Sequence, residues 1–328
     1  MSELDQLREA AKVVYASMGP SPQIRWPLLE SRLGCPVWLK HENHLPTGAF
    51  KVRGGLYYFA QLAATAMPER VICATRGNHG QSVAFAAAAA GVEVVIVVPR
   101  GNNPEKNAAI EGYGAKLLVE GDDFVESLRF AETMAQKVNL HWVPSYHQDL
   151  VVGVGTYALE LLTAAPDLTR IYVPIGLGSG ACGVLMAKAA LQHSVQVIGV
   201  VSSHAPTYLQ SIMEGYPIAS DSAETIADGL AVREANPEAL SWLRTGLSKV
   251  MSVTDDEVTE AMRILLKGTH NLVEGAGAAP FAAALRDQAS IGDGESIGVI
   301  ISGGNVSSGL LKQTLEEGWR ARSDPLHW

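Results

Sequence analysis

Residues 171–180 read IYVPIGLGSG, an apolar run that passes directly into a glycine-rich turn. The run at 171–175 is typical of a buried strand, and the residues after the turn have the spacing of a helix. Glycines let the backbone approach a bound group closely, and the N–H groups that open a helix attract an anion. The stretch therefore predicts a strand, a phosphate-binding turn and a helix, although glycine-rich turns of this kind are common.

The same alternation of strand and helix extends along the chain on both sides of this stretch. Further strands are predicted at residues 71–74, 94–98, 116–119, 195–201 and 296–301, and helices at 81–90, 124–137, 157–164, 184–191 and 255–266. Apolar strands separated by helices are typical of open, twisted, mostly parallel sheets that helices cover on both faces. The predicted fold class is therefore α/β, and 328 residues suggest two such domains.

Composition limits the classes of function. The chain carries 34 acidic and 25 basic residues, a net charge of −9, which gives no electrostatic support for binding nucleic acid. No apolar run is long enough to span a membrane, and the first 15 residues lack the pattern of a secretion signal. The three cysteines have no CxxC spacing, which argues against a disulfide framework and a zinc site. We therefore expect a cytoplasmic protein.

Lys51 lies in the apolar and glycine-rich stretch PTGAFKVRGG at residues 46–55. Its neighbours Phe50 and Val52 exclude water from the amine, and desolvation favours the neutral, nucleophilic form of a lysine. A lysine that holds an aldehyde cofactor as a Schiff base needs these properties. A single lysine is more often simply exposed at a helix start, so the interpretation depends on three further loops.

The first of these loops, TRGNHGQ at residues 75–81, lies between a predicted strand and a predicted helix. The N–H groups at such a junction bind an anion, for example the carboxylate of a substrate. Asn78 is either a helix cap or a hydrogen-bond partner for a cofactor hydroxyl.

The other two loops follow predicted strands as well. Ser302 opens SGGN at residues 302–305, where its hydroxyl can hydrogen-bond a ring nitrogen without protonating it, although a simple turn has the same pattern. No acidic residue follows the strand at 195–201 at the spacing of a dinucleotide site. The turn at 176–180 therefore favours a mononucleotide-like phosphate over NAD.

A buried lysine, an anion-binding loop, a phosphate loop and a ring-nitrogen contact are together what pyridoxal 5′-phosphate requires. The segments PTGAFKVRGG, TRGNHGQS, VPIGLGSG and SGGN resemble the serine/threonine dehydratase family of fold-type II (tryptophan synthase β-like) pyridoxal-phosphate enzymes. These segments span nearly the whole chain, and their combination is highly specific.

The resemblance implies a role for each matching residue. Lys51 would hold the cofactor as a Schiff base, Phe50 would pack near its ring, and Asn78 would contact the ring hydroxyl. Ser302 would meet the pyridine nitrogen, and the phosphate would be bound by Gly176, Leu177, Gly178, Ser179 and Gly180. The substrate would contact Thr75, Arg76, Gly77, His79, Ser145, Tyr146 and Glu274.

The resemblance also implies how the chain is organised. Residues 1–47 and 143–328 would form a large domain that binds pyridoxal phosphate, and residues 48–142 would form a small mobile domain. Relatives are mostly dimers or tetramers, so a homodimer or homotetramer is expected. The chain to Trp328 has no room for the regulatory domain of biosynthetic threonine dehydratases, and we expect no feedback by isoleucine.

Two departures from the family pattern change the expectations. Arg76 stands where serine racemases and many dehydratases of this family carry a serine that acts as a second base. Arginine stays protonated, so we expect no racemisation, and Arg76 would bind either a substrate carboxylate or a neighbouring acidic side chain. Metal-dependent members carry two carboxylates after the strand that here ends at Val201, whereas this chain reads SSHAPT, so no metal site is expected.

The predicted activity is the β-elimination of water from a β-hydroxy-α-amino acid, which gives a 2-oxo acid and ammonium. Threonine or serine is the first expectation, while Arg76 and the unusual segment Ser145-Tyr146-His147 leave 3-hydroxyaspartate or a bulkier substrate such as phenylserine open. The alternatives are a β-replacement enzyme of the cysteine synthase type and a non-catalytic relative that binds pyridoxal phosphate.

Overall fold

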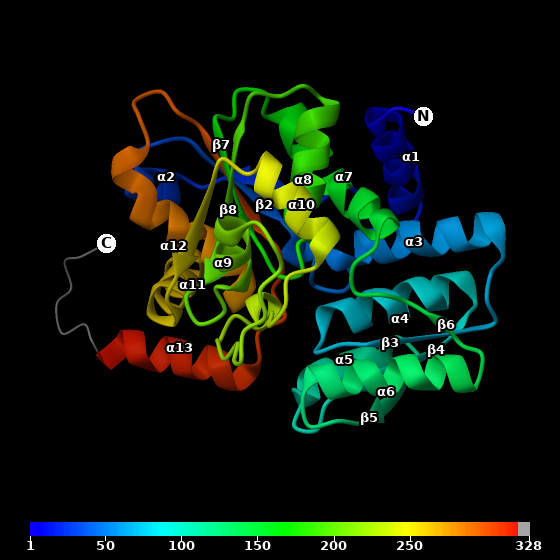
Figure 1. Ribbon diagram of the computed structural model, residues 1–328. Helices are drawn as coiled ribbons and strands as arrows, with labels where there is room; N and C mark the ends of the chain where they lie inside the picture. The colour runs from blue at the N-terminus through cyan, green and yellow to red at the C-terminus, as the bar shows by residue number, and fades with distance from the viewer. Residues whose placement is uncertain (321–328) are drawn as a thin grey trace. The chain divides into compact units, whose positions relative to one another are not determined.

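The structure is a computed structural model that describes residues 1–320 (Figure 1). The chain divides into two compact units. Unit 1 comprises Met1–Ser21, His44–Pro166 and Leu177–Ser194, and unit 2 comprises Pro22–Asn43, Asp167–Gly176 and the chain from Val195 onward. Each unit is built on one mostly parallel sheet with helices packed against it, so the predicted α/β class is confirmed.

Unit 1 contains a four-stranded sheet in the order β5-β4-β3-β6. All its pairings are parallel, and its strands are β3 (Arg70–Ala74), β4 (Glu93–Val98), β5 (Lys116–Val119) and β6 (His141–Trp142). Parallel strands need crossover connections, which α4 (Asn78–Ala90), α5 (Pro104–Gly112) and α6 (Phe124–Lys137) provide.

Alternate residues of this sheet enter two separate cores. Cys73 and Ile96 belong to the core that includes residues of α3 (Lys51–Thr65), α4 and α5, whereas Ile72 and Val97 belong to the core formed with α6. Figure 1 shows α4 and α6 on opposite sides of β3 and β4. Because both faces are buried, these strands are apolar along their length rather than alternating.

Three further helices complete unit 1: α1 (Glu3–Tyr15), α7 (Gln148–Ala164) and α8 (Ser179–Ala190). A buried ion pair joins α3 to α7, since Nη1 of Arg53 lies 2.6 Å from Oε1 of Glu160 and Nη2 lies 3.0 Å from Oε2. The Arg53 side chain is fully buried, and it also donates to Thr156 at 3.0 Å. The hydroxyl of Tyr15 donates to the same carboxylate at 2.7 Å, so Glu160 ties three helices together.

Unit 2 contains a six-stranded sheet in the order β1-β2-β10-β7-β8-β9. Only the edge pair β1–β2 is antiparallel, and the strands are β1 (Gln23–Arg25), β2 (Val37–His41), β7 (Arg170–Pro174), β8 (Gln196–Ser202), β9 (Lys249–Val253) and β10 (Ile297–Ile301). The helices of this unit are α2 (Pro27–Leu33), α9 (Thr207–Glu214), α10 (Pro237–Gly246), α11 (Asp255–Thr269), α12 (Gly275–Asp287) and α13 (Ser308–Arg320).

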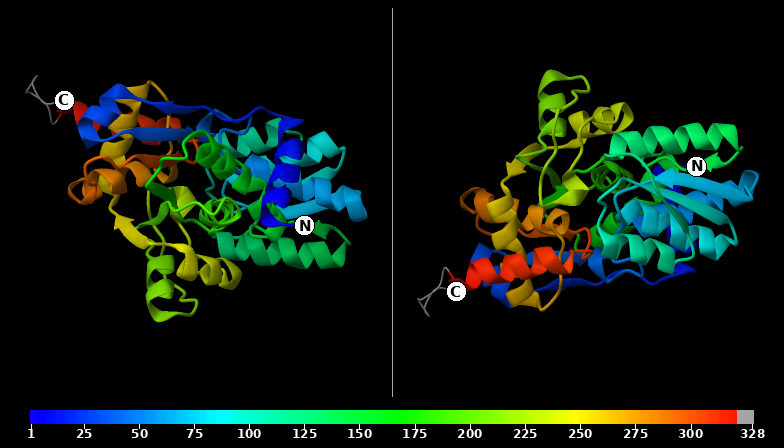
Figure 2. Two further views of the ribbon diagram at one scale, coloured as in Figure 1. Left: turned by 90° about the horizontal axis from the view of Figure 1, so that it is seen from above. Right: turned by 90° about the horizontal axis from the view of Figure 1, so that it is seen from below.

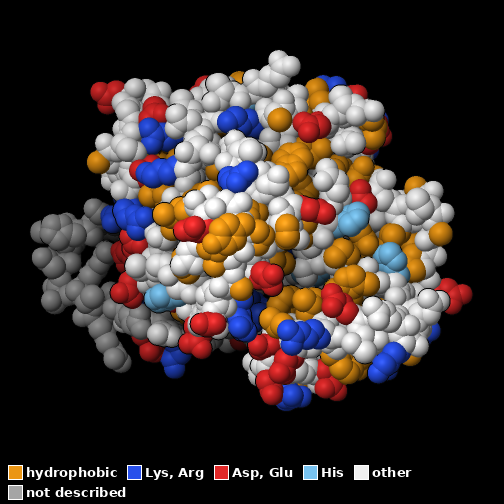
Figure 3. All heavy atoms as spheres, in the orientation of Figure 1, with side chains coloured by type: hydrophobic (Ala, Val, Ile, Leu, Met, Phe, Trp, Pro, Cys, Tyr) orange, Lys and Arg blue, Asp and Glu red, His pale blue; other side chains and the backbone are white. Residues whose placement is uncertain are grey.

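The core of unit 2 is built around α12, which contacts strands β7, β8, β9 and β10. The small side chains of Ala279 and Ala283 let the helix approach the sheet, and Phe281 fills the same core. The outer helix α11 packs on α12, and α13 packs on α11 (Figure 2). On the face shown in Figure 3, acidic and basic side chains are interspersed. Among the described residues, no helix is both long and apolar enough to cross a bilayer.

Candidate active site

Lys51 is the first residue of α3, directly after Phe50, whose backbone is already helical at φ −57° and ψ −24°. Its amine lies 3.3 Å from the hydroxyl of Ser179 and 5.2 Å from the centre of the Phe50 ring. Burial lowers the pKa of the Lys51 amine to about 8 from its ordinary value of 10.5, because desolvation penalises the charged form. The amine therefore loses its proton far more readily than an exposed lysine does.

The glycine-rich turn meets Lys51 at the start of α8. Gly178 is the N-cap of this helix at φ +101°, a conformation that favours glycine. Gly180 lies next to Phe50, since a Cβ at this position would be in ordinary contact with the phenyl ring at 3.5 Å. The hydroxyl of Tyr157 donates to the Gly180 carbonyl at 2.8 Å. Unit 1 thus brings the predicted lysine and the helix start at 178–180 together, and it adds Tyr157, which the sequence had not indicated.

The loop after β3 is folded around Thr75. Its buried hydroxyl accepts hydrogen bonds from the N–H groups of Gly77 at 3.0 Å and Gly80 at 3.1 Å. Asn78 is the first residue of α4, so the loop leads into a helix N-terminus as predicted. Ser82 on the same helix donates to the Lys51 carbonyl at 2.6 Å and joins α4 to the start of α3. Ser82 ends the segment TRGNHGQS, but the sequence analysis gave it no role.

His79 is a buried base in this loop. Its pKa falls to about 3, mainly through burial and further through the charge of Lys51, while a hydrogen bond to the Val143 backbone acts in the opposite direction. The imidazole is therefore neutral. Its Nε2 atom is buried and has no hydrogen-bond partner among the described residues. A buried unpaired acceptor is costly, and a bound group that donates a hydrogen bond would relieve this cost.

Arg76 is exposed, in contrast to the buried residues around it. It lines a hollow of about 110 Å³ with residues that follow β4 and β5, among them Arg100, Asn102 and Asp122. Arg100 is already paired with Asp122 at 2.6 Å. The Arg76 guanidinium therefore lies at the carboxyl edge of the small sheet, where ligands of open α/β sheets bind.

The segment Ser145-Tyr146-His147 precedes α7. The Tyr146 hydroxyl lies 3.6 Å from the thiol sulfur of Cys182, which places it against the first turn of α8. Ser145 is half-buried, whereas His147 is exposed and caps α7 by accepting from the Asp149 N–H at 3.1 Å. Tyr146 thus joins the group around Ser179, and His147 has a structural role at the helix end.

Leu177 belongs to unit 1, whereas Gly176, Ser302 and Glu274 lie in unit 2. Gly176 has no room for a side chain, because a Cβ there would lie 2.2 Å from the carbonyl oxygen of Gly229. Ser302 is buried at the end of β10, and the following Gly303 carbonyl accepts from the Glu274 N–H at 3.1 Å. Glu274 is buried at the N-terminus of α12. Unit 2 thus brings the SGGN segment and Glu274 together, and Gly229 is an unpredicted neighbour of the turn.

These residues fit the requirements of pyridoxal 5′-phosphate. The chain provides an amine of lowered pKa, helix N-termini with N–H groups, and glycines at which a Cβ would collide with backbone. It also provides an unpaired buried acceptor on His79. In the described part of the chain, no cluster of three or more His, Cys, Asp or Glu side chains is arranged for a metal, and His204 lies 3.3 Å from Asp255.

Comparison with known proteins agrees with this chemistry. Pyridoxal-phosphate dependent enzymes, as a family, match residues 14–303. An L-threonine ammonia-lyase of Geobacter sulfurreducens is 34% identical over 288 residues, which cover 88% of this chain and 71% of that protein. The structure of maize serine racemase aligns with a TM-score of 0.89 at 27% identity over 98% of both chains. The processed form of threonine deaminase isoform 2 from Solanum lycopersicum aligns with a TM-score of 0.87 at 26% identity over 95% of this chain and 93% of that one.

The chain therefore belongs to the family of pyridoxal-phosphate-dependent enzymes, and its cofactor is pyridoxal 5′-phosphate. The resemblance to serine/threonine dehydratases of fold-type II is confirmed.

Proposed function

We propose that this protein is an ammonia-lyase that removes water from a β-hydroxy-α-amino acid and releases a 2-oxo acid and ammonium. The observation that carries the proposal is the Lys51 amine of lowered pKa, held at the start of α3 beside Ser179. The relatives support the choice of reaction, since the Geobacter protein is a threonine ammonia-lyase that matches most of this chain. L-Threonine is the first candidate substrate, and L-serine, 3-hydroxyaspartate and phenylserine are the alternatives.

Pyridoxal phosphate, when bound, withdraws electrons from the α-carbon of an amino acid and makes its proton acidic. Lys51 then acts as the base that accepts this proton, because its amine is readily neutral. The electrons of the Cα–H bond then form a double bond between the α- and β-carbons, and the hydroxyl leaves with the electrons of its own C–O bond. It takes up one proton as it leaves and becomes water, so this proton balances the one removed from the α-carbon. Hydrolysis of the remaining C–N bond takes up one water, so the net products are the 2-oxo acid and ammonium.

The other residues are proposed to bind and orient. The 176–180 turn would hold the phosphate, Asn78 the ring hydroxyl and Ser302 the ring nitrogen. The loop Thr75–His79 would bind the substrate carboxylate at the start of α4, with Ser145, Tyr146 and Glu274 near the substrate. In this assignment, residues 48–142 act as a small mobile domain against a large domain of residues 1–47 and 143–328.

Arg76 favours elimination over racemisation. A guanidinium stays protonated at every working pH and cannot remove a proton from the second face of a substrate. Its exposed position at the carboxyl edge of the small sheet suits recognition of a second carboxylate, as in 3-hydroxyaspartate.

We further propose that the enzyme is a cytoplasmic homodimer or homotetramer. The support for the compartment is that Cys35, Cys73 and Cys182 are all buried and that none of them forms a disulfide. The support for the assembly is analogy with the family.

The proposed function is tested by measuring 2-oxo acid and ammonium release from purified holoenzyme. The substrates are L-threonine, L-serine, threo- and erythro-3-hydroxyaspartate and phenylserine, each with and without a chelator. We expect turnover of at least one of them, with both products formed in equal amounts and no effect of the chelator. Trapping of added sulfide as a new amino acid, without ammonium release, would identify the β-replacement alternative instead.

A further inference from the structure

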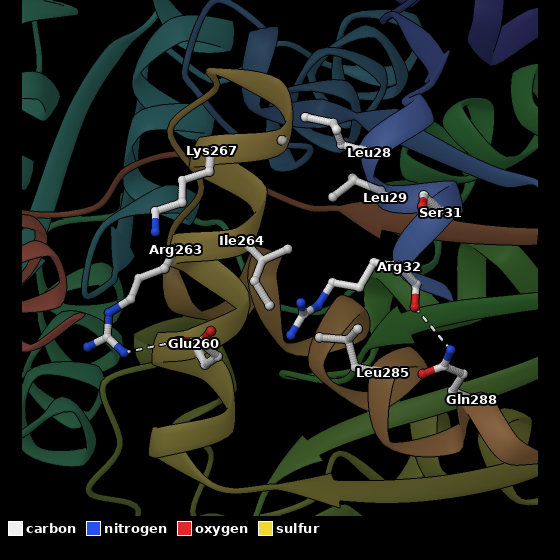
Figure 4. Close-up of a pocket in the computed structure, with 11 residues that line it drawn as sticks. Leu28, Leu29, Ser31, Arg32, Glu260, Arg263, Ile264, Lys267, Leu285 and Gln288 are labelled. Atoms are coloured by element: carbon white, nitrogen blue, oxygen red, sulfur yellow. Dashed lines mark hydrogen bonds and ion pairs between the residues drawn. The ribbon is translucent and has the colours of Figure 1, made fainter. Parts of the chain in front are cut away.

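A second cavity lies in unit 2, between α2, α11, the end of α12 and the short 3₁₀ helix η3 (Gln288–Ser290) (Figure 4). Its volume is about 540 Å³, within the range of small-molecule sites. None of its lining residues belongs to the turn at 176–180, the SGGN segment or the α12 start at Glu274. The cavity is therefore separate from the residues assigned to the cofactor and the substrate.

Four apolar side chains form much of the wall: Leu28, Leu29, Ile264 and Leu285. Leu28 is 55% exposed, and a ligand in the cavity would cover it together with its apolar neighbours. At Gly268, which also lines the cavity, the helices α2 and α11 approach so closely that a Cβ would lie 2.7 Å from the Leu29 side chain. An apolar body can therefore lie between these two helices.

The charged side chains of the wall are mostly basic. Arg32, Arg263 and Lys267 face a single acidic residue, Glu260, in a chain whose net charge is −9. Arg263 is already engaged, because it donates to the Thr314 carbonyl and lies 3.2 Å from Glu260. This local excess of positive charge is opposite in sign to the net charge of the whole molecule, and it favours an anionic ligand.

Arg32 is the basic residue best placed to meet such a ligand. Figure 4 shows its guanidinium directed between Ile264 and Leu285 rather than away from the cavity. Among the side chains and carbonyls that the structure describes, none accepts a hydrogen bond from this guanidinium. The Arg32 backbone carbonyl accepts from the side-chain amide of Gln288 at 3.0 Å. Five N–H donors are thus available beside an apolar wall.

We infer that this cavity binds a small amphipathic anion, with a carboxylate, phosphate or sulfonate group at Arg32 and an apolar body against the leucine and isoleucine side chains. The inference does not rest on the proposed function. The ligand class follows from two features that occur together, namely an apolar wall in which Leu28 is exposed and an unengaged guanidinium.

The test uses two fluorescent probes that differ in charge. 1-Anilinonaphthalene-8-sulfonate carries the anionic group, and N-phenyl-1-naphthylamine is its neutral counterpart. Both are titrated into the pyridoxal-phosphate-loaded enzyme at low salt. We expect saturable binding of the sulfonate with one site per chain, and weaker binding of the neutral probe.

Three variants locate the site. Arg32→Gln should weaken sulfonate binding about tenfold, the effect of one lost charge-assisted contact, and leave the neutral probe unchanged. Leu28→Asn, at an exposed position that a polar residue tolerates, should weaken both probes. Arg129→Gln, an exposed arginine on α6 in unit 1, is the matched control and should change neither.

Sulfonate binding that is unchanged in both Arg32→Gln and Leu28→Asn would overturn the inference. A second result would also overturn it: the sulfonate does not bind, and Arg32→Gln changes the oligomeric state measured by sedimentation. A second copy of the chain would then cover the cavity.

Discussion

Lys51 and His79 are two bases whose pKa values the fold of unit 1 lowers by burial. Desolvation lowers the pKa of both, and the charge that Lys51 can carry lowers the pKa of His79 further. Only one positive charge is therefore tolerated in this region, and it belongs to the lysine. A neutral His79 with an unpaired Nε2 can accept a hydrogen bond from a bound group, while the lysine changes its protonation near the working pH.

His79 should make the stability of the protein depend on pH. Its pKa is about 3 in the folded protein and near 6.5 when exposed, so the unfolded chain binds more protons between these values. The free energy of unfolding should therefore fall as the pH is lowered through this window. We predict that His79→Asn reduces this slope between pH 6.5 and pH 4, as measured by urea unfolding at several pH values. An unchanged slope would contradict a buried, neutral His79.

At the scale of single elements, the turns between strands and helices need glycine at particular points. Gly176 follows β7 by two residues, and its missing Cβ leaves space for the Gly229 carbonyl. Gly112, at the end of α5, has open space at the same point. Replacing each of these two glycines by alanine therefore distinguishes a steric clash, expected only at Gly176, from the general effect of replacing a glycine.

Gly176→Ala should cost about 1–3 kcal/mol of stability, because the added methyl group forces Gly229 to move. The same movement should weaken the affinity for pyridoxal phosphate, which is measured by the return of absorbance when cofactor is added to the apo-enzyme. Gly112→Ala is the control and should change stability by less than about 0.5 kcal/mol. Equal behaviour of the two variants would show that the close approach at Gly176 is unimportant.

The buried ion pair of Arg53 and Glu160 links α3, which begins at Lys51, to α7. Arg53→Met should lower the free energy of unfolding by about 3–5 kcal/mol, since the Glu160 carboxylate is left buried without its cation. The double variant Arg53→Met with Glu160→Met should recover most of this loss. Urea unfolding of both proteins checks the prediction, and a loss below about 1 kcal/mol in the single variant would contradict it.

The sequence predicted strands better than helix starts. The strands at 71–74, 94–98 and 116–119 recur within one residue, because continuous apolar runs are a strong signal. The helix predicted from residue 157 begins instead at Gln148, and the one predicted from 184 begins at Ser179. Gly153 and Gly155 weaken the helical pattern of α7, but in the structure other segments pack closely against the helix at these two positions. A Cβ at Gly153 would lie 2.5 Å from the Arg53 carbonyl.

The sequence analysis did not predict strand β2, because polar residues interrupt its apolar pattern. Its sequence VWLKH ends in Lys40 and His41, which lower its apparent hydrophobicity, although both side chains are buried. The Trp26 indole donates to His41 at 3.0 Å, and Lys40 donates to Gln23 at 3.3 Å. Hydrogen bonds to Gln23 in the edge strand and to Trp26 next to it thus allow Lys40 and His41 to be buried. These partners are not visible in the local sequence pattern of the strand.

For the whole molecule, the motifs identified the chemistry but not the neighbours that support it. Lys51, the turn and the SGGN segment were recognised because each has a local pattern of glycines or apolar residues. Tyr157 and Gly229 have no such pattern, and Ser82 ends the TRGNHGQS segment without a predicted role. These three residues contribute through contacts between distant segments. The family is established by the match to residues 14–303.

The central claim is that Lys51 is the residue that bonds to pyridoxal phosphate. Reduction of the purified yellow protein with borohydride, followed by digestion and mass spectrometry, tests it directly. The account predicts one pyridoxyl-phosphate group per chain, on the peptide that contains Lys51, and none in a Lys51→Ala protein, which should also lose 2-oxo acid formation. A label on another lysine, or a Lys51→Ala protein that forms the 2-oxo acid at a normal rate, would contradict the account.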